Sequence, residues 1–260
     1  MTEDRNALFD ITDRVIIVTG ASSGIGKMLT IGLTDAGAKV VACARRKEMI
    51  EEYIGDRSAL AVRCDVADDD DRAHLIEETL AAYGRIDALV NNAGISGGGF
   101  PATRQSTEEF RQVIEVDLVA PFDLSKRCLP SFREQGGGSI VNVTSTAAIV
   151  SCANQIPQAA YCAAKGGLAH LTKELAVQWG RYNVRVNAFA PGSFATEMTE
   201  LMFTEGTTAS AARHRSTERT AIKRTAGHDD ALGIIQYLVS DASTFVTGQH
   251  IAVDGGYTVG

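Results

Sequence analysis

The fold of this 260-residue chain is decided by one stretch near its start, Val15-Ile16-Ile17-Val18-Thr19-Gly20-Ala21-Ser22-Ser23-Gly24-Ile25-Gly26. Its first four residues form an apolar run typical of a buried strand, and a helical pattern follows at 27–36. The three glycines between them permit a tight turn and a close approach of the backbone to a ligand. A helix that begins there presents free N–H groups and the positive end of its dipole, which suits a pyrophosphate. The alternative interpretation is a flexible turn without a ligand.

Short apolar runs alternate with longer helical patterns over almost the whole chain. The runs lie at 15–18, 40–43, 60–62, 88–90, 140–143, 184–188 and 251–253. Strands without polar alternation, separated by helices, indicate a parallel sheet that is covered on both faces. We therefore expect an α/β fold: a doubly wound, Rossmann-type sheet of seven parallel strands with helices on both faces. The whole chain, 1–260, is predicted to be one domain, with a substrate loop at about 193–227.

The composition narrows the class of protein. Hydrophobic residues make up 45% of the chain and charged residues 22%, as in soluble globular proteins. The net charge of −7 argues against a nucleic-acid partner. No apolar run is long enough for a membrane span, and residues 1–13 lack the apolar region of a signal peptide. We therefore expect a cytoplasmic protein without a membrane partner.

The five cysteines include no C-x-x-C pair, which argues against a metal site. We expect reduced thiols that pack as small hydrophobic residues. Cys162 could alternatively be a nucleophile, but no histidine lies near it in sequence.

A tyrosine and a lysine, Tyr161 and Lys165, stand four residues apart within a helical pattern. At this spacing both side chains project from one face of a helix, about one turn apart. A fixed cation beside a phenol favours its ionised form and makes proton exchange with an alcohol feasible. Taken alone, the pattern is more often that of an ordinary helix with one amphipathic and one solvated side chain.

Several motifs occur in the order found in the short-chain dehydrogenase/reductase family, which the chain resembles from about residue 10 to residue 257. They are 19–26, 64–66, 91–94, Ser145, 161–165, 191–192 and 253–256. In style the chain is most similar to gluconate 5-dehydrogenase-like and 3-oxoacyl reductase-like members of that family.

The resemblance implies a catalytic group of Ser145, Tyr161 and Lys165, with Thr144 as a competing candidate for the serine. The serine would position the substrate oxygen, and the tyrosine would exchange a proton with it. Asp117 is the fourth member, because it occupies the position of an asparagine that is thought to hold a proton-relay water in the family. An aspartate there adds negative charge near Lys165, so we expect activity with an altered pH profile.

The resemblance also implies a nicotinamide dinucleotide site. Its predicted residues are Gly20, Ser22, Ser23, Gly24, Ile25, Gly26, Arg45, Arg46, Asp65, Val66, Asn91, Ala93, Gly94, Tyr161, Lys165, Pro191, Gly192, Phe194 and Thr196. An enzyme that prefers NAD generally has a carboxylate at the end of the second strand, where this chain has Ala44 followed by Arg45. Arginine suits a 2′-phosphate, which favours NADP(H) over NAD(H). Asp65 could instead be a helix cap.

Two further segments are predicted to shape the substrate site. Ser145 and Tyr161 are further apart than is usual in the family, so 147–158 should bulge outward as part of the substrate wall or as a neutral insertion. The basic residues at 213–224 could meet an anionic substrate or form a solvated face.

The predicted function is an NADP(H)-dependent interconversion of a ketone and a secondary alcohol on a small molecule, possibly a sugar acid or polyol. The alternatives are a 3-oxoacyl thioester reductase and a non-catalytic, dinucleotide-binding redox sensor. The resemblance also implies a homotetramer.

Overall fold

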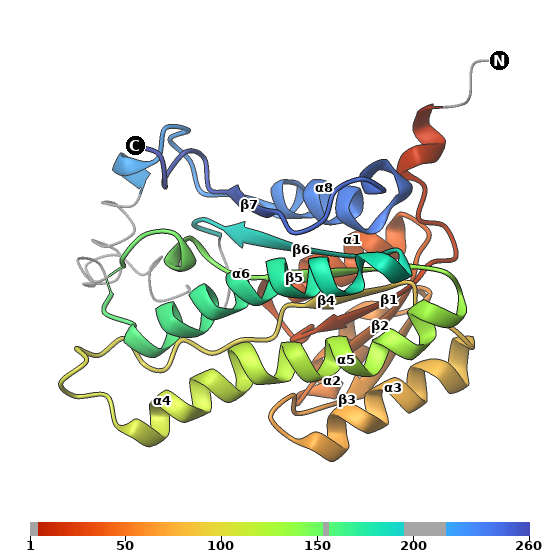
Figure 1. The fold of residues 1–260 in the computed structure, drawn as a ribbon, viewed down its shortest axis with the longest axis horizontal. Coiled ribbons are helices and arrows are strands. Elements are labelled where there is room, and N and C mark those ends of the chain that lie inside the picture. The colour runs from red at the N-terminus through yellow and green to blue at the C-terminus, as the bar shows by residue number, and fades with distance from the viewer. Residues whose placement is uncertain (1–4, 153–155, 195–216) are drawn as a thin grey trace.

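Seven parallel strands form one sheet in the computed structural model, which describes residues 5–152, 156–194 and 217–260 (Figure 1). The strands are β1 (Val15–Thr19), β2 (Lys39–Ala44), β3 (Ala59–Arg63), β4 (Ala88–Asn91), β5 (Gly138–Val143), β6 (Val184–Pro191) and β7 (His250–Val253). Their spatial order is β3-β2-β1-β4-β5-β6-β7, and each neighbouring pair is parallel. The order reverses between β1 and β4, which is the point where ligands bind in doubly wound sheets. The predicted fold class is confirmed.

Helices cover both faces of the sheet. One face carries α1 (Gly24–Asp35), α2 (Lys47–Ile54) and α8 (His228–Val239), and the other carries α3 (Asp69–Tyr83), α5 (Ala120–Glu134) and α6 (Ala159–Trp179). Side chains alternate between the two layers along β1: Ile16 and Val18 pack with α1, whereas Val15 and Ile17 pack with α3 and α5. Burial on both faces explains why the strands read as continuous apolar runs.

The helical segment between β4 and β5 is divided into three pieces. Helix α4 (Thr107–Ile114) begins with a capping box formed by Ser106 and Glu109, and a π-helical turn, Glu115–Val119, joins it to α5. Pro121, in the first turn of α5, has no N–H to donate to the preceding turn, so the regular hydrogen-bond pattern is lost there. This π-helical turn carries Asp117, and such turns occur frequently at functional sites.

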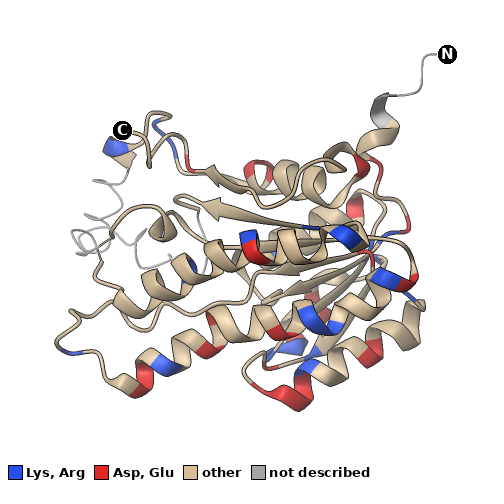
Figure 2. Ribbon diagram, in the orientation of Figure 1, with Lys and Arg blue, Asp and Glu red and all other residues tan. Residues whose placement is uncertain are grey.

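Charge and sulfur are distributed as the sequence suggests. Acidic residues predominate along α3, whereas α5 carries residues of both signs (Figure 2). All five cysteines are free thiols, and Cys43, Cys64 and Cys128 are buried. Within the described ranges, every helix is too short or too polar to cross a bilayer.

Candidate active site

The glycine turn joins the end of β1 to the start of α1. Gly20 has a φ of 68°, and a Cβ atom added there would lie 2.8 Å from Cα of Ala93. A Cβ atom at Gly26 would overlap the Gly20 carbonyl. A larger side chain at either position would push apart the turn, α1 and the end of β4, so their close approach depends on glycine.

Asn92 fastens this turn to β4. Its Nδ2 donates to the carbonyl of Thr19 at 2.8 Å, and the Thr19 hydroxyl accepts from the N–H groups of Asn92 and Ala93 at 2.9 Å. Ser23, the N-cap residue of α1, makes no capping hydrogen bond with its side chain. A helix start of this kind suits an anionic ligand, which fits the predicted pyrophosphate site.

A cavity of about 310 Å³ opens beside the glycine turn, at the carboxyl ends of the strands. Its volume lies within the range usual for small-molecule sites. The predicted cofactor residues that line it are Gly20, Ser22, Ser23, Gly24, Ile25, Arg45, Arg46, Asp65, Val66, Ala93, Gly94, Tyr161, Lys165 and Pro191. Residues distant in sequence thus meet around one cavity.

Four predicted cofactor residues do not line this cavity. Gly26 supports the Gly20 turn from behind, and Gly192 packs against the turn after β7, where a Cβ atom would lie 2.6 Å from Cα of Asp254. Phe194 is buried edge-on against Phe189, with ring centroids 6.2 Å apart. Asn91 joins β4 to β5, because its Nδ2 donates to Oδ1 of Asn142 at 2.9 Å. Thr196 lies outside the described residues.

Ala44, which the prediction named as the position of a missing carboxylate, also lines the cavity. Eight further lining residues were not among the predicted cofactor residues. They are Cys64, Ala67, Asn92, Ile95, Gln112, Val116, Val143 and Thr144. Most of them neighbour a predicted residue just past a strand, and that position was the available signal. Gln112 and Val116 come from α4 and the π-helical turn, and only the packing of those elements brings them to the cavity.

Two arginines follow β2 at the rim of the cavity. Arg45 and Arg46 are exposed, and Nη2 of Arg46 donates to the Ser22 hydroxyl at 3.3 Å. The position at the end of β2 is occupied by Ala44. This rim therefore presents guanidinium groups where a carboxylate would select a free ribose hydroxyl.

Tyr161 and Lys165 lie one turn apart on α6 and both line the cavity. Nζ of Lys165 is 5.6 Å from the centroid of the Tyr161 ring and donates to the carbonyl of Val143 at 3.0 Å. It also forms an ion pair with Asp117, with 3.1 Å between Nζ and Oδ2. The lysine is thereby held between the end of β5 and the π-helical turn, beside the tyrosine.

The pKa of Tyr161 is raised above its ordinary value. Burial is the largest cause, and it outweighs Lys165, which lowers the pKa. Asp117 raises it further, while a hydrogen bond with the Ser145 side chain lowers it. The sequence predicted the effect of the lysine correctly, but the net direction is set by burial and by the added carboxylate.

Asp117 is fully buried, and its Oδ1 accepts from the N–H of Ile95 at 2.8 Å. A Cβ atom at Gly94 would lie 2.9 Å from its Oδ2, so the glycine leaves room for the ion pair. Burial raises the pKa of Asp117, against the lowering effect of Lys165. Burial lowers the pKa of Lys165, but Asp117 and Tyr161 outweigh it and the net change is upward. Each charge of the pair thus depends on the other.

The hydroxyls of Thr144 and Ser145 have different surroundings. Thr144 is buried, donates from Oγ1 to the carbonyl of Phe189 at 3.0 Å, and lies 2.8 Å from Nε2 of His250. Ser145 accepts from the N–H of Ala147 at 3.1 Å, and its side chain hydrogen bonds with Tyr161. Thr144 lines the cavity and Ser145 does not, but the Thr144 hydroxyl is engaged by Phe189 and His250, whereas Ser145 hydrogen bonds with Tyr161, which favours Ser145 as the partner of the tyrosine.

No cluster of three or more potential metal ligands occurs within 5–152, 156–194 and 217–260.

Asp68, not Asp65, caps α3, since its side chain accepts from the N–H groups of Asp70 and Asp71. The alternative interpretation of Asp65 as a helix cap is therefore wrong.

Comparison with known proteins extends these findings. A family model described as enoyl-(acyl carrier protein) reductase matches residues 20–258. A 2-dehydro-3-deoxy-D-gluconate 5-dehydrogenase from Formosa agariphila is 33% identical over 259 residues, which cover 96% of this chain and 94% of that protein. A 3-oxoacyl-[acyl-carrier-protein] reductase from Thermotoga maritima is 35% identical over 251 residues, covering 95% and 98%. The solved structure of a gluconate 5-dehydrogenase from Burkholderia cenocepacia, in complex with NADP and tartrate, has a TM-score of 0.88 and 30% identity, covering 98% of each chain.

Proposed function

Because the chain belongs to the short-chain dehydrogenase/reductase family, we propose that it interconverts a ketone and a secondary alcohol on a small molecule, with NADP(H) as the preferred cofactor. Family membership confirms the resemblance found in the sequence, and with it the expectation of an NAD(P)-dependent oxidoreductase that acts on CH–OH groups. The observation that carries the proposal is the meeting of Tyr161 and Lys165 with the glycine turn around one cavity.

The residues present fit such a cofactor. Gly20 and Gly26 leave space for a close backbone approach, and the uncapped start of α1 suits a pyrophosphate. Residues 64–67 would face the adenine ring, and Tyr161 and Lys165 would lie at the nicotinamide end. The bound cofactor supplies a hydride to the carbonyl carbon in reduction, or accepts one in oxidation.

Tyr161 is the proposed proton donor and acceptor. In reduction, its Oη gives a proton to the oxygen that becomes the alcohol, and in oxidation it removes that proton. Lys165 favours the ionised phenol, and the Ser145 hydroxyl donates a hydrogen bond to the substrate oxygen. Asp117 keeps Lys165 charged and fixes its ammonium beside the tyrosine, as the 3.1 Å ion pair suggests.

The preference for NADP(H) rests on the rim after β2. Arg45 and Arg46 offer charge-assisted hydrogen bonds to a 2′-phosphate, and Ala44 provides no carboxylate for a ribose hydroxyl. The solved relative in complex with NADP supports the same preference.

Two classes of substrate are candidates for the proposed reaction. A relative that acts on a dehydrodeoxygluconate supports a sugar acid, and a relative that reduces 3-oxoacyl groups on a carrier protein supports an acyl thioester. Of the basic residues at 213–224 that were proposed to meet an anionic substrate, Arg213, His214 and Arg215 lie outside the described residues. Arg219 donates to the carbonyl of Gly260 at 3.1 Å, and Arg224 forms an ion pair with Asp230 at 2.6 Å, which favours the solvated face for that part of the segment.

One experiment tests the function and separates these candidates. NADPH and NADH consumption is measured with a panel of ketones, keto sugar acids and 3-oxoacyl thioesters. We expect turnover with one class, and a loss of at least about a hundredfold for Tyr161→Phe with that substrate. Tight cofactor binding without turnover on any member would contradict the proposal and favour the redox sensor.

Arg45→Ala tests the cofactor preference within the same assay. The substitution should raise KM for NADPH by roughly tenfold, because a charge-assisted contact with the 2′-phosphate is lost. KM for NADH should stay within about twofold, since NADH has no 2′-phosphate. Equal losses for both cofactors would contradict the preference.

A further inference from the structure

The segment 64–67, between β3 and α3, forms one wall of the cavity, and we name it the 64–67 wall. All four of its residues line the cavity. The N–H of Asp65 donates to Oδ2 of Asp71 at 2.8 Å, and the N–H of Ala67 donates to Oδ1 of Asp65 at 3.1 Å. The first turn of α3 therefore holds this wall from outside the cavity.

Arg72 provides a second point of attachment between the wall and α3. Its side chain is 6% exposed, and its Nη1 donates to the carbonyl of Val66 at 2.7 Å. The same guanidinium contacts Asp123 on α5 through Nε at 2.8 Å and Asp69 through Nη2 at 3.0 Å. One planar group thus joins the wall of the cavity to two helices of the layer behind it.

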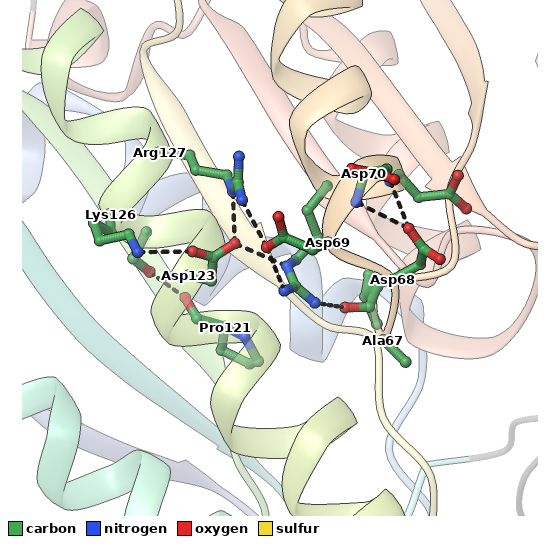
Figure 3. A network of polar contacts seen from close by, with 12 residues as sticks. Ala67, Asp68, Asp69, Asp70, Pro121, Asp123, Lys126 and Arg127 are labelled. Carbon is green, nitrogen blue, oxygen red and sulfur yellow. Dashed lines mark hydrogen bonds and ion pairs between the residues drawn. The ribbon is translucent and has the colours of Figure 1, made fainter.

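Arg72 belongs to a cluster of charged residues whose other members are Asp69, Asp123, Lys126 and Arg127. Both carboxylates in this cluster have more than one cationic partner. Asp123 also contacts Lys126 and Arg127, and Asp69 also contacts Arg127 (Figure 3). The cluster would therefore keep its anions paired if one arginine were replaced. The contact with Val66 distinguishes Arg72 from Arg127, because the Arg127 contacts reach these two carboxylates.

We infer that Arg72 is a positioning residue for the cofactor: it fixes the 64–67 wall from behind, so that the adenosine half of the dinucleotide meets a preformed surface. The inference rests on the proposed function, which assigns this cavity to a dinucleotide. A wall held before binding does not have to be ordered during binding, and that saving appears as affinity. Arginine suits this task because its rigid fork reaches three acceptors at once, whereas lysine presents one compact ammonium.

The test compares two identical chemical changes in the full-length protein. Arg72→Lys and Arg127→Lys each keep a positive charge next to Asp123, but Arg72→Lys alone removes a donor to Val66. The dissociation constants of NADPH and of the adenosine-half probe 2′-phospho-ADP-ribose are measured by titration calorimetry. For Arg72→Lys we expect both constants to rise roughly tenfold, as expected for loss of a hydrogen bond from a charged donor, while Arg127→Lys stays within about twofold.

A change in the dissociation constants without a change in kcat distinguishes a positioning role from a general loss of structure. At saturating NADPH, kcat of Arg72→Lys should remain within about twofold of wild type, because the Tyr161 end is untouched. Equal weakening by both variants, or a fall in kcat with unchanged dissociation constants, would overturn the inference.

Asp71→Ala provides a second variant in case Arg72→Lys does not fold. Asp71 is partly exposed and holds the same wall through the N–H of Asp65, so its loss should also weaken 2′-phospho-ADP-ribose. Wild-type affinity in Asp71→Ala would overturn the inference. A wild-type protein that binds neither NADPH nor NADH would overturn the proposed function, and this inference with it. Binding by wild type with no difference among the variants would overturn the inference alone.

Discussion

Two groups of charged residues lie beside the same cavity, and they are built differently. At the proposed catalytic end, Lys165 and Asp117 form a buried pair, 4% and 0% exposed, in which each charge has one opposite charge at hydrogen-bonding distance. Behind the 64–67 wall, which is proposed to meet the adenosine half, Asp123 has three cations around it, Arg72, Lys126 and Arg127. A pair makes each pKa depend on one partner, whereas a cluster spreads that dependence over several.

The pKa values follow this difference. Burial raises the pKa of Asp117, and the single lysine does not reverse it. Burial also raises the pKa of Asp123, but hydrogen bonds from Arg127, Lys126 and Arg72 outweigh it and hold that pKa well below its usual range. The carboxyl group of Asp117, which has one cationic partner, thus has a pKa above its ordinary value. A carboxylate with three partners keeps its charge, which suits a fixed framework.

The largest effect is expected when the pair loses its cation. In Lys165→Met, a side chain of similar length keeps the packing, but the phenol loses the charge that favours its ionised form. We expect turnover to fall by about a thousandfold. Steady-state kinetics with the substrate identified by the panel measure this loss.

Lys165→Met should also change how stability depends on pH. The pKa of buried Asp117 lies above that of the unfolded chain, so its contribution is fully present below the unfolded value and is lost as pH rises through the folded one. In Lys165→Met the cation that lowers this pKa is gone, so the urea midpoint of the variant should fall relative to wild type as pH rises above the unfolded value of 3.8. Adding Asp117→Asn as a second substitution should restore the midpoint without restoring turnover. A pH-independent midpoint in the single variant would contradict this view of the pair.

A smaller effect, measured as the free energy of unfolding, is expected when the cluster loses Asp123. Asp123→Ala leaves the buried guanidinium of Arg72 without its closest partner on α5. Removing one member of a buried ion pair costs about 3 kcal/mol of unfolding free energy. The control Lys126→Gln should cost less than about 1 kcal/mol, because that lysine is largely exposed and Asp123 keeps two arginines. Urea unfolding measures both, and equal costs would contradict the redundancy of the cations.

Acid should reduce the difference in stability between wild type and Asp123→Ala. The pKa of Asp123 is lowered in the folded state, so its contribution is present above the unfolded value of 3.8 and is lost as pH falls through the folded one. The difference in unfolding free energy between wild type and Asp123→Ala should therefore shrink below about pH 4.

The sequence predicts the parts of this comparison that have local signals. Apolar runs, the glycine turn and the four-residue spacing of Tyr161 and Lys165 were enough for the sheet, the cavity and the tyrosine–lysine pair. Arg72 and Asp123 carry no such signal, because they are 51 positions apart and meet only when α3 packs beside α5. The net rise in the pKa of Tyr161 is equally hidden, since burial is its largest cause and burial belongs to the folded chain.

Two neighbouring asparagines also differ in a way that the sequence motif does not predict. Asn91 and Asn92 are identical in type, but Asn91 ends β4 and points into the layer toward Ser125, whereas Asn92 lies past the strand and lines the cavity. Side chains alternate in direction along a strand, so the residue at which β4 ends decides which asparagine meets the ligand. A motif read as a block does not contain that information.

The smallest effect is expected when the pair keeps its shape but loses its anion. Asp117→Asn retains an acceptor for the N–H of Ile95, so kcat at the optimum should stay within about tenfold of wild type. The pH profile for alcohol oxidation should move as a whole to lower pH. Asp117 raises the pKa of Tyr161, so its removal moves the ascending limb to lower pH. It also raises the pKa of Lys165, so the descending limb, where the ammonium is lost, moves the same way. The limbs report the coupled group as a unit, and the direction of both is the test. A profile identical to wild type would show that the carboxylate does not tune the pair, and a shift of the ascending limb to higher pH would reverse its proposed sign.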